Sequence, residues 1–139
     1  MEAAIESDRE RCLSLSRDIG YLTGQENNVG RTHLTVCCLT DQVLQEMLDA
    51  HLASLFALAT PFRSNSPSPF PFGTLGSRIT TEVRAQVPIM LRHRLSPPPQ
   101  ETYSLNRKLS GIFLLCEALG SEVDAKSLLN KAFFKADNR

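Results

Sequence analysis

Four side chains that could ligate a metal ion are the first candidates for chemistry in this sequence: His33, Cys37, Cys38 and His51. Structural zinc sites usually separate the two ligands of each pair by a few residues. Here the two cysteines are adjacent, so they cannot both chelate one ion comfortably. His51 falls on the apolar face of an expected helix, where a hydrogen-bonded core histidine is the commoner outcome. We therefore predict that this chain provides no metal ligands.

The cysteines are the next candidates, as nucleophiles or as disulfide partners. A cysteine nucleophile needs a lowered pKa and a positioned base. Cys116 has Glu117 beside it and no histidine at helical spacing, and both Cys12 and Cys116 fall on apolar helical stripes, where cysteine packs as a small hydrophobe. The sequence has no secretory signal, which favours reduced thiols. We predict core packing rather than catalysis or disulfides.

Basic residues gather in the middle of the chain, although the net charge is zero. Residues 52–108 carry seven basic and two acidic side chains, whereas residues 1–51 carry four basic and nine acidic ones. The cluster could receive phosphate or anionic lipid. Aromatic residues are not interleaved with it, so nucleic acid is not an expected partner. We expect three of its arginines to pair with acidic groups or helix C-termini: Arg92, Arg94 and Arg107.

Nucleotide-binding signatures are missing from the sequence. It has no Gly-rich phosphate loop and no kinase-type lysine strand or catalytic loop. Phe72-Gly73 resembles the end of the metal-binding Asp-Phe-Gly motif of kinases, but Pro71 stands where the aspartate belongs, and proline cannot ligate magnesium. We predict that this chain alone is inactive, with no catalytic, cofactor-binding or metal residues.

Apolar periodicity predicts the elements that hold these residues. Residues spaced by three and four indicate amphipathic helices, and no segment alternates well enough to be a strand. Five helices are expected: 3–19 ended by Gly20, 43–59 ended by Pro61, 77–92 with Pro88 inside it, a fourth from the Pro97–Pro99 run to Leu119, and a fifth capped by Asp124 and carrying Leu128, Ala132 and Phe133. The face of the fourth helix is predicted to comprise Leu105, Leu109, Ile112, Cys116 and Leu119.

The predicted fold class is all-α, with long loops near residues 27–42 and 60–76. Prolines and serines fill the second loop, and proline cannot support a regular ladder. A faintly strand-like run at 35–39 has no partner strand, so we assign it to the first loop. No apolar run approaches the roughly 18 residues that span a bilayer. The acidic first twenty residues indicate neither a secretory signal nor a mitochondrial targeting segment.

The stretch from Val87 to Gly111, VPIMLRHRLSPPPQETYSLNRKLSG, is not a generic helical sequence. It closely resembles the C-terminal region of the UbiB-type atypical kinases, the aarF-domain-containing proteins of coenzyme Q biosynthesis in animal mitochondria. Shorter matches in the same order lie at 8–26 and 49–73. The resemblance covers roughly residues 3–28 and 47–120, and residues 84–116 carry most of its specificity.

The resemblance implies that residues 1–139 are a partial C-lobe of a kinase-like domain. The family's nucleotide-binding and catalytic motifs lie upstream of the matching region, so none is carried over. Mg-ATP, a mitochondrial location and support of ubiquinone synthesis are implied for a full-length parent. The implied partners are coenzyme Q biosynthesis proteins and the missing part of the kinase domain, against which exposed apolar faces would pack. The alternative is a stand-alone helical module that binds a partner protein or an anionic membrane surface through the basic middle.

Three features depart from the family pattern. Asn106 stands where the family usually has histidine. The loop from Arg63 to Pro71 is longer and richer in serine and proline than the family's acidic version. Residues 28–42 match nothing in the family and are interpreted as an insertion. A valine codon begins GT and a glutamine codon can end AG, so a retained intron read in frame would explain the segment from Val29 to Gln42.

Overall fold

The computed structural model describes residues 1–22, 37–93 and 99–136, with side chains for all of these except 37–41 and 134–136. The elements, in chain order, are α1 (Glu2–Ile5), α2 (Arg9–Asp18), α3 (Cys37–Ala59), the 3-10 turn η1 (Thr60–Phe62), β1 (Phe70–Pro71), the π-helical turn η2 (Phe72–Gly76), α4 (Ser77–His93), α5 (Gln100–Ala118), β2 (Glu122–Val123) and α6 (Ala125–Ala136). Helices dominate, which confirms the predicted all-α class. None of the helices within the described ranges has the length and apolarity to cross a membrane.

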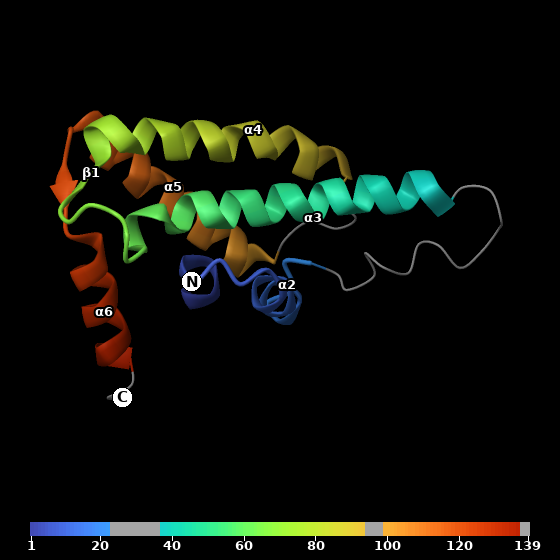
Figure 1. The fold of residues 1–139 in the computed structure, drawn as a ribbon, viewed down its shortest axis with the longest axis horizontal. Helices are drawn as coiled ribbons and strands as arrows, with labels where there is room; N and C mark the ends of the chain where they lie inside the picture. Colours follow the sequence, from blue (N-terminus) through green and yellow to red (C-terminus); the bar gives the residue numbers. More distant parts are fainter. Residues whose placement is uncertain (23–36, 94–98, 137–139) are drawn as a thin grey trace.

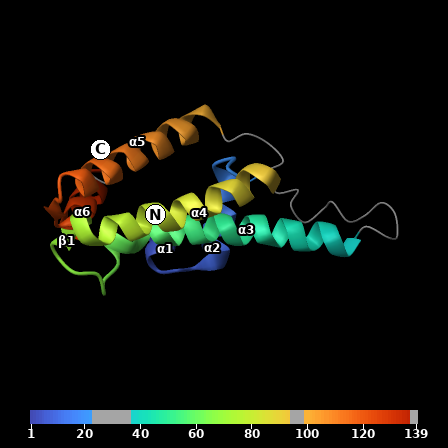
Figure 2. The ribbon, with the colours of Figure 1, turned by 90° about the horizontal axis from the view of Figure 1, so that it is seen from above.

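The centre of the molecule is the long antiparallel pair of α3 and α4 (Figure 1). The short helices α1 and α2 lie against α3. Seen from above, α5 begins away from α4 and converges on it towards the end of the molecule that carries β1 (Figure 2). From that same end α6 projects away from the central pair (Figure 1). The C-terminal end of α5 thus lies close to α4, whereas its N-terminal end lies apart from it.

Apolar burial, the main favourable term in folding, is concentrated in three clusters of the described residues, of which the smallest comprises Leu22, Met47 and Leu48. A second cluster joins α1 and α2 to α3 and comprises Ala3, Ala4, Cys12, Leu52 and Ala59. The third is an aromatic cluster at the β1 end, built from Ala57, Phe70, Phe72, Ile79 and Phe113. Phe72 makes edge-to-face contacts there, with ring centroids 4.9 Å from Phe70 and 5.3 Å from Phe113. This cluster joins α3, α4 and α5 to the segment before α4.

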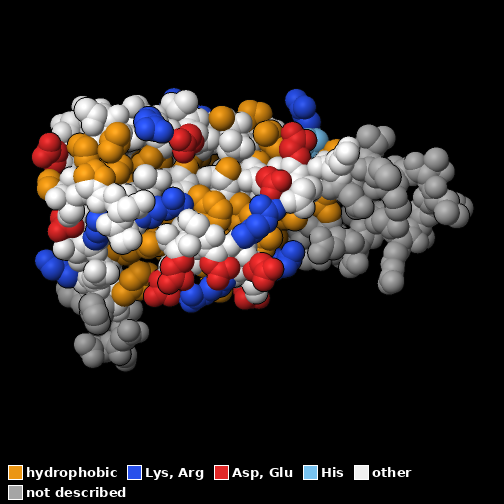
Figure 3. Space-filling view, in the orientation of Figure 1, with side chains coloured by type: hydrophobic (Ala, Val, Ile, Leu, Met, Phe, Trp, Pro, Cys, Tyr) orange, Lys and Arg blue, Asp and Glu red, His pale blue; other side chains and the backbone are white. Residues whose placement is uncertain are grey.

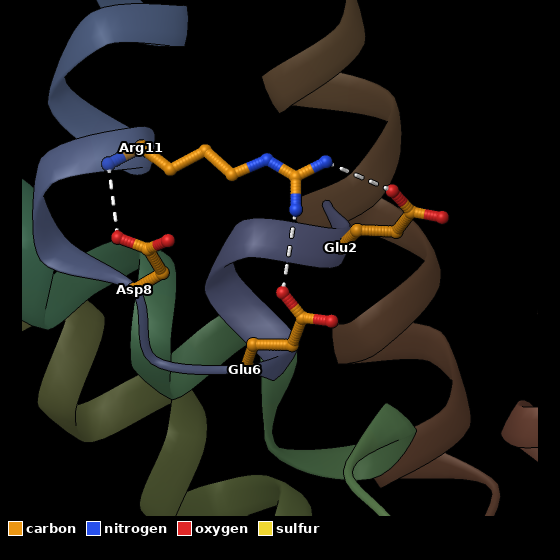
Figure 4. A network of polar contacts seen from close by, with 4 residues as sticks. All are labelled: Glu2, Glu6, Asp8 and Arg11. Atoms are coloured by element: carbon orange, nitrogen blue, oxygen red, sulfur yellow. Dashed lines mark hydrogen bonds and ion pairs between the residues drawn. The ribbon is translucent and has the colours of Figure 1, made fainter.

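The continuous helix predicted over residues 3–19 is wrong, because the chain breaks between α1 and α2. Ser7 adopts a φ of 59°, in the left-handed region that a helix cannot contain. Asp8 then caps α2, and its carboxylate accepts a hydrogen bond from the backbone N–H of Arg11 at 3.0 Å (Figure 4). An Asp at this position satisfies one of the free amides of a new helix. The Ser-Asp pair was the sequence signal for this break.

The first predicted loop is partly wrong, because α3 begins at Cys37 rather than near Val43. Residues 37–42 are therefore helical, and they include the end of the strand-like run at 35–39. Residues 23–36 lie outside the described part of the chain. The insertion predicted over 28–42 is not tested by this geometry and stays a prediction.

The predicted loop at 60–76 contains three short elements instead of irregular backbone alone. β1 pairs antiparallel with β2, with Phe70 opposite Val123, so the prediction of no strand is wrong at this one place. Proline has no backbone N–H to donate, but Pro71 is not required as a donor in this pairing. The neighbouring N–H of Phe72 donates instead, to the carbonyl of Ser121 at 2.9 Å. Side chains of the α6 region also hold the loop, since the Lys126 ammonium donates to the Ser66 carbonyl at 2.6 Å.

Glycine ends two helices as the sequence predicts. Gly20 follows α2 with a φ of 69°, and Gly120 follows α5 with a φ of 60°. After α2, the N–H of Tyr21 donates to the carbonyl of Ser16 at 2.8 Å. After α5, the N–H of Ser121 donates in the same way to the carbonyl of Cys116 at 2.9 Å. This is the Schellman arrangement, in which a left-handed residue satisfies the last carbonyls of the helix. The glycines thus fix where the chain leaves α2 and α5.

We expect Gly73→Ala to destabilise the protein by about 1–3 kcal/mol, as overpacking of a close contact does. A Cβ at residue 73 would lie 2.9 Å from the Cα of Gly120, and backbone on both sides leaves little room to yield. Gly111→Ala is the matched control, since a Cβ at that helical position meets nothing within 4 Å. The control should stabilise by about 0.5–1 kcal/mol through helix propensity. If thermal denaturation gave Gly73→Ala a higher melting temperature than Gly111→Ala, the close packing of Gly73 against Gly120 would be refuted.

Candidate functional site

A buried polar cluster connects α2 to α3. The Oγ of Ser16 lies 2.8 Å from the Nε2 of His51, and both residues are buried. The ring of Tyr21 stacks on the imidazole with centroids 4.5 Å apart. This confirms the prediction that His51 is a hydrogen-bonded core residue. A serine beside a histidine is also the arrangement of a nucleophile and its base, but both groups are covered by protein, so the pair holds two helices together.

The structure describes the candidate metal ligands of the sequence only in part. Among the side chains that the structure describes, at 1–22, 42–93 and 99–133, no three His, Cys, Asp or Glu gather in a way that could hold a metal ion. His51 is engaged as described. His33 lies outside the described residues, as do the side chains of Cys37 and Cys38.

Two cysteines occupy the core positions predicted for them. Cys12 is a buried free thiol beside α3, and Cys116 packs partly buried against the aromatic cluster. Burial raises the pKa of the Cys12 thiol, because a thiolate is poorly solvated there. A raised pKa opposes nucleophilic reactivity. Cys12 therefore acts as a small apolar side chain.

Ion pairs concentrate on α1, α2 and α3 rather than on the basic middle of the chain. The guanidinium of Arg11 bridges the carboxylates of Glu2 and Glu6 at 3.4 and 3.3 Å (Figure 4). Arg9 pairs with Asp49 of α3. Acidic and basic side chains accordingly gather over α1 and α2 at the lower edge of the molecule (Figure 3). All these groups are largely exposed, so they add little to stability.

The pairing predicted for the basic cluster is found in part among the described residues, because Arg92 lies in the last turn of α4, at the C-terminus of that helix. Arg92 and Arg107 are exposed and form no ion pair with a described residue, and Arg94 lies outside the described part of the chain. Near the C-terminal end of α4, the Nε2 of His93 lies 3.9 Å from a carboxylate oxygen of Glu46. The sequence could not reveal this, because helical spacing does not show which acids face α4 or α5.

A shallow, open groove lies between α3 and α4. Its lining includes the carboxylates of Glu46 and Asp49, with Gln45 and Gln86 beside them. Asp49 already accepts hydrogen bonds from Arg9 and Gln45, and Glu46 faces His93. The polar groups of this groove are therefore largely used within the fold.

Asp124 caps α6 as predicted. Its carboxylate accepts hydrogen bonds from the Ser127 hydroxyl at 2.6 Å, from the Ser127 backbone N–H at 3.2 Å and from the Ser68 hydroxyl at 2.9 Å. These bonds, those of Ser127 most of all, lower the pKa of Asp124. The cap thus anchors both α6 and the Pro/Ser-rich loop.

The cap predicts a pH dependence. Because the folded pKa of Asp124 is lowered, its contribution is complete above the unfolded value of about 3.9 and is lost as pH falls through the folded pKa. Asp124→Asn keeps an acceptor but removes the charge, so its melting temperature should lie below wild type at neutral pH. The two melting curves should converge in strong acid. A gap that persists unchanged at low pH would contradict the role of the charge.

Helix α5 exposes a row of large apolar side chains, and here the predicted helix face is partly wrong. Leu109 and Cys116 pack into the aromatic cluster as predicted, but the buried residue of this helix is Phe113, which the predicted face does not include. Three members of the predicted face point outward instead. Together with Leu115 they form a row that we call the α5 seam. The exposed fractions of its side chains are 64% for Leu105, 58% for Ile112, 58% for Leu115 and 70% for Leu119.

The α5 seam follows one side of the helix. Its members are seven, three and four residues apart, so they share a face. From Leu105 to Leu119 the row is about 21 Å long at the helical rise per residue. Lys108 lies in the same row and is also exposed. Apart from Lys108 the row is apolar, and exposed apolar patches of this kind often mark surfaces that bind another protein.

Comparison with curated proteins places these features in a family. The chain is 42% identical over 128 residues to the mitochondrial atypical kinase COQ8 of Schizosaccharomyces pombe, covering 92% of this chain and 18% of that protein. It is 37% identical over 126 residues to COQ8 of Saccharomyces cerevisiae, covering 91% of this chain and 21% of that protein. This chain is homologous to the C-terminal region of the COQ8 atypical kinases. The predicted UbiB-type resemblance is thereby confirmed.

A mammalian relative shows the same relation to COQ8. The mitochondrial atypical kinase COQ8B of Rattus norvegicus is 33% identical over 135 residues, covering 97% of this chain and 22% of that protein. The chain thus spans about a fifth of the length of these COQ8 relatives, and the match is wider than the two segments identified from the sequence. The relatives are named mitochondrial, as the resemblance implies. No family model and no solved structure matches the chain.

Proposed function

We propose that this chain forms the C-terminal helical part of a COQ8-type atypical kinase that supports ubiquinone synthesis in mitochondria. The observation that carries the proposal is the identity of 33–42% to COQ8 proteins over more than nine tenths of the chain. The helical fold and the exposed α5 seam agree with a part of a larger domain. In this role the helices pack beneath the active site and position it without touching nucleotide.

In this proposal Mg-ATP is bound by the rest of the kinase. The sequence supports this assignment, since it has no Gly-rich phosphate loop. Its partners are the remainder of the kinase domain and proteins of coenzyme Q biosynthesis.

A chimera tests the proposal. In S. pombe COQ8, the segment that matches this chain is replaced by the chain itself, and the chimera is expressed in cells that lack their own COQ8. Ubiquinone content should be restored, because the helices support the catalytic part as the native segment does. A chimera that carries Phe72→Ala in the aromatic cluster is the control that should fail. A well-expressed wild-type chimera that yields no ubiquinone would refute the proposal.

The size of the native polypeptide provides an independent test. An antibody against residues 95–108 should detect a band well above 15.4 kDa, the mass of this chain, because the working protein is the longer kinase. A single band at 15.4 kDa would contradict the proposal and favour a short helical interaction module.

The exposed arginines of α4 favour that module as a second candidate. Arg78, Arg84 and Arg92 are all exposed and form no ion pair within the described residues. If they bind an anionic membrane, the chain should sediment with vesicles that contain an anionic lipid and not with pure phosphatidylcholine. Added salt should weaken the binding by screening. Absence of sedimentation at low salt would exclude this candidate.

A further inference from the structure

We infer that the α5 seam is the surface on which the preceding, catalytic part of the kinase packs. The inference rests on the proposed function and adds to it the residues that join the two parts: Leu105, Ile112, Leu115 and Leu119. These side chains are more than half exposed, whereas Phe113, on another face of the same helix, is buried. The helix is therefore packed on one side only.

The amount of missing polypeptide identifies the occupant. The chain accounts for 18–22% of the COQ8 relatives, so about four fifths of such a protein lies outside it. That part is joined to these helices in one polypeptide, which gives it a high effective concentration at any surface it can reach. A row about 21 Å long offers four turns of ridges and grooves to a facing helix.

Charge argues against a membrane as the occupant of this surface. Helix α5 contains two acidic and two basic residues, Glu101, Glu117, Arg107 and Lys108. A helix that lies on an anionic membrane usually combines its apolar face with an excess of lysine and arginine. The row of the α5 seam contains one cation, Lys108, and four exposed apolar side chains, so it lacks that excess.

The test compares one substitution in two settings. Ile112→Asp places a charge in the seam, and Ser110→Asp places the same charge at an exposed position of α5 outside the seam. In the isolated chain residue 112 is exposed, so both variants should melt close to wild type. In the S. pombe chimera, Ile112→Asp should lower the melting temperature and reduce soluble protein several-fold, because it buries an unpaired charge. Ser110→Asp should leave both quantities unchanged.

The outcomes separate this inference from the proposed function. If the wild-type chimera restores ubiquinone but Ile112→Asp has no more effect in it than Ser110→Asp, the inference is wrong and the proposed function stands. Sedimentation equilibrium of the isolated chain tests a second copy as the occupant. A dimer that Ile112→Asp dissociates, together with an unaffected chimera, would assign the seam to self-association. Vesicle binding that Ile112→Asp abolishes would assign it to a membrane.

Discussion

Replacing Phe72 by alanine should lower the free energy of unfolding by about 3–5 kcal/mol, the range measured for truncating large buried aromatic side chains. Phe72 is 4% exposed and contacts the rings of both Phe70 and Phe113. Its removal leaves a cavity where the segment before α4 meets α5, and it ends two edge-to-face ring contacts. Because small domains are stable by only about 5–15 kcal/mol, the loss is a large part of the total. Urea denaturation of wild type and variant measures it.

Tyr103→Ala is the matched control for this prediction. Tyr103 is also an aromatic residue, but it is exposed on α5. Its truncation should change stability by no more than about 0.5 kcal/mol. Equal losses in the two variants would mean that the aromatic cluster does not form the core of this end of the molecule.

His51→Ala is expected to cost about 2–4 kcal/mol, through a cavity and a lost buried hydrogen bond. His51 is 3% exposed, its Nε2 shares a hydrogen bond with the Oγ of Ser16, and its ring stacks on that of Tyr21. The variant leaves the Ser16 hydroxyl without this partner and removes the ring that joins α2 to α3. Thermal and urea denaturation should both record the loss.

Ser16→Ala separates the hydrogen bond from the cavity. This variant removes only the hydroxyl, so it should cost less, about 1–2 kcal/mol. The double variant should be less destabilised than the sum of the single variants, because both remove the same contact. Strictly additive losses would contradict direct coupling between Ser16 and His51.

The sequence alone predicts the positions of helices well and the packing between them poorly. It predicted α4 within a residue and the glycine ends of α2 and α5, because these depend on local periodicity and on a left-handed residue. It missed the break at Ser7, where a single residue in the left-handed region outweighs a helical apolar pattern. It also assigned residues 37–42 to a loop, although they extend α3.

Local patterns also do not show which residues surround His51 or which side of α5 is buried. The burial of His51 followed from its position on an apolar stripe, but Ser16 and Tyr21 come from another part of the chain, so only the folded arrangement brings them to it. On α5, periodicity grouped Leu105, Ile112 and Leu119 with Leu109 and Cys116. How much of a wide apolar face is covered depends on the angle at which neighbouring elements cross it.

By itself the sequence determined that this protein is helical, that its cysteines at positions 12 and 116 are core residues, and that it is related to the UbiB-type kinases. These properties depend on local spacing and on the order of residues along the chain. Only the tertiary structure decided that the Pro/Ser-rich loop is held by Lys126 and Asp124, and that α5 buries Phe113 while it exposes the seam. Such contacts join residues far apart in sequence, and their geometry is set by how whole elements pack.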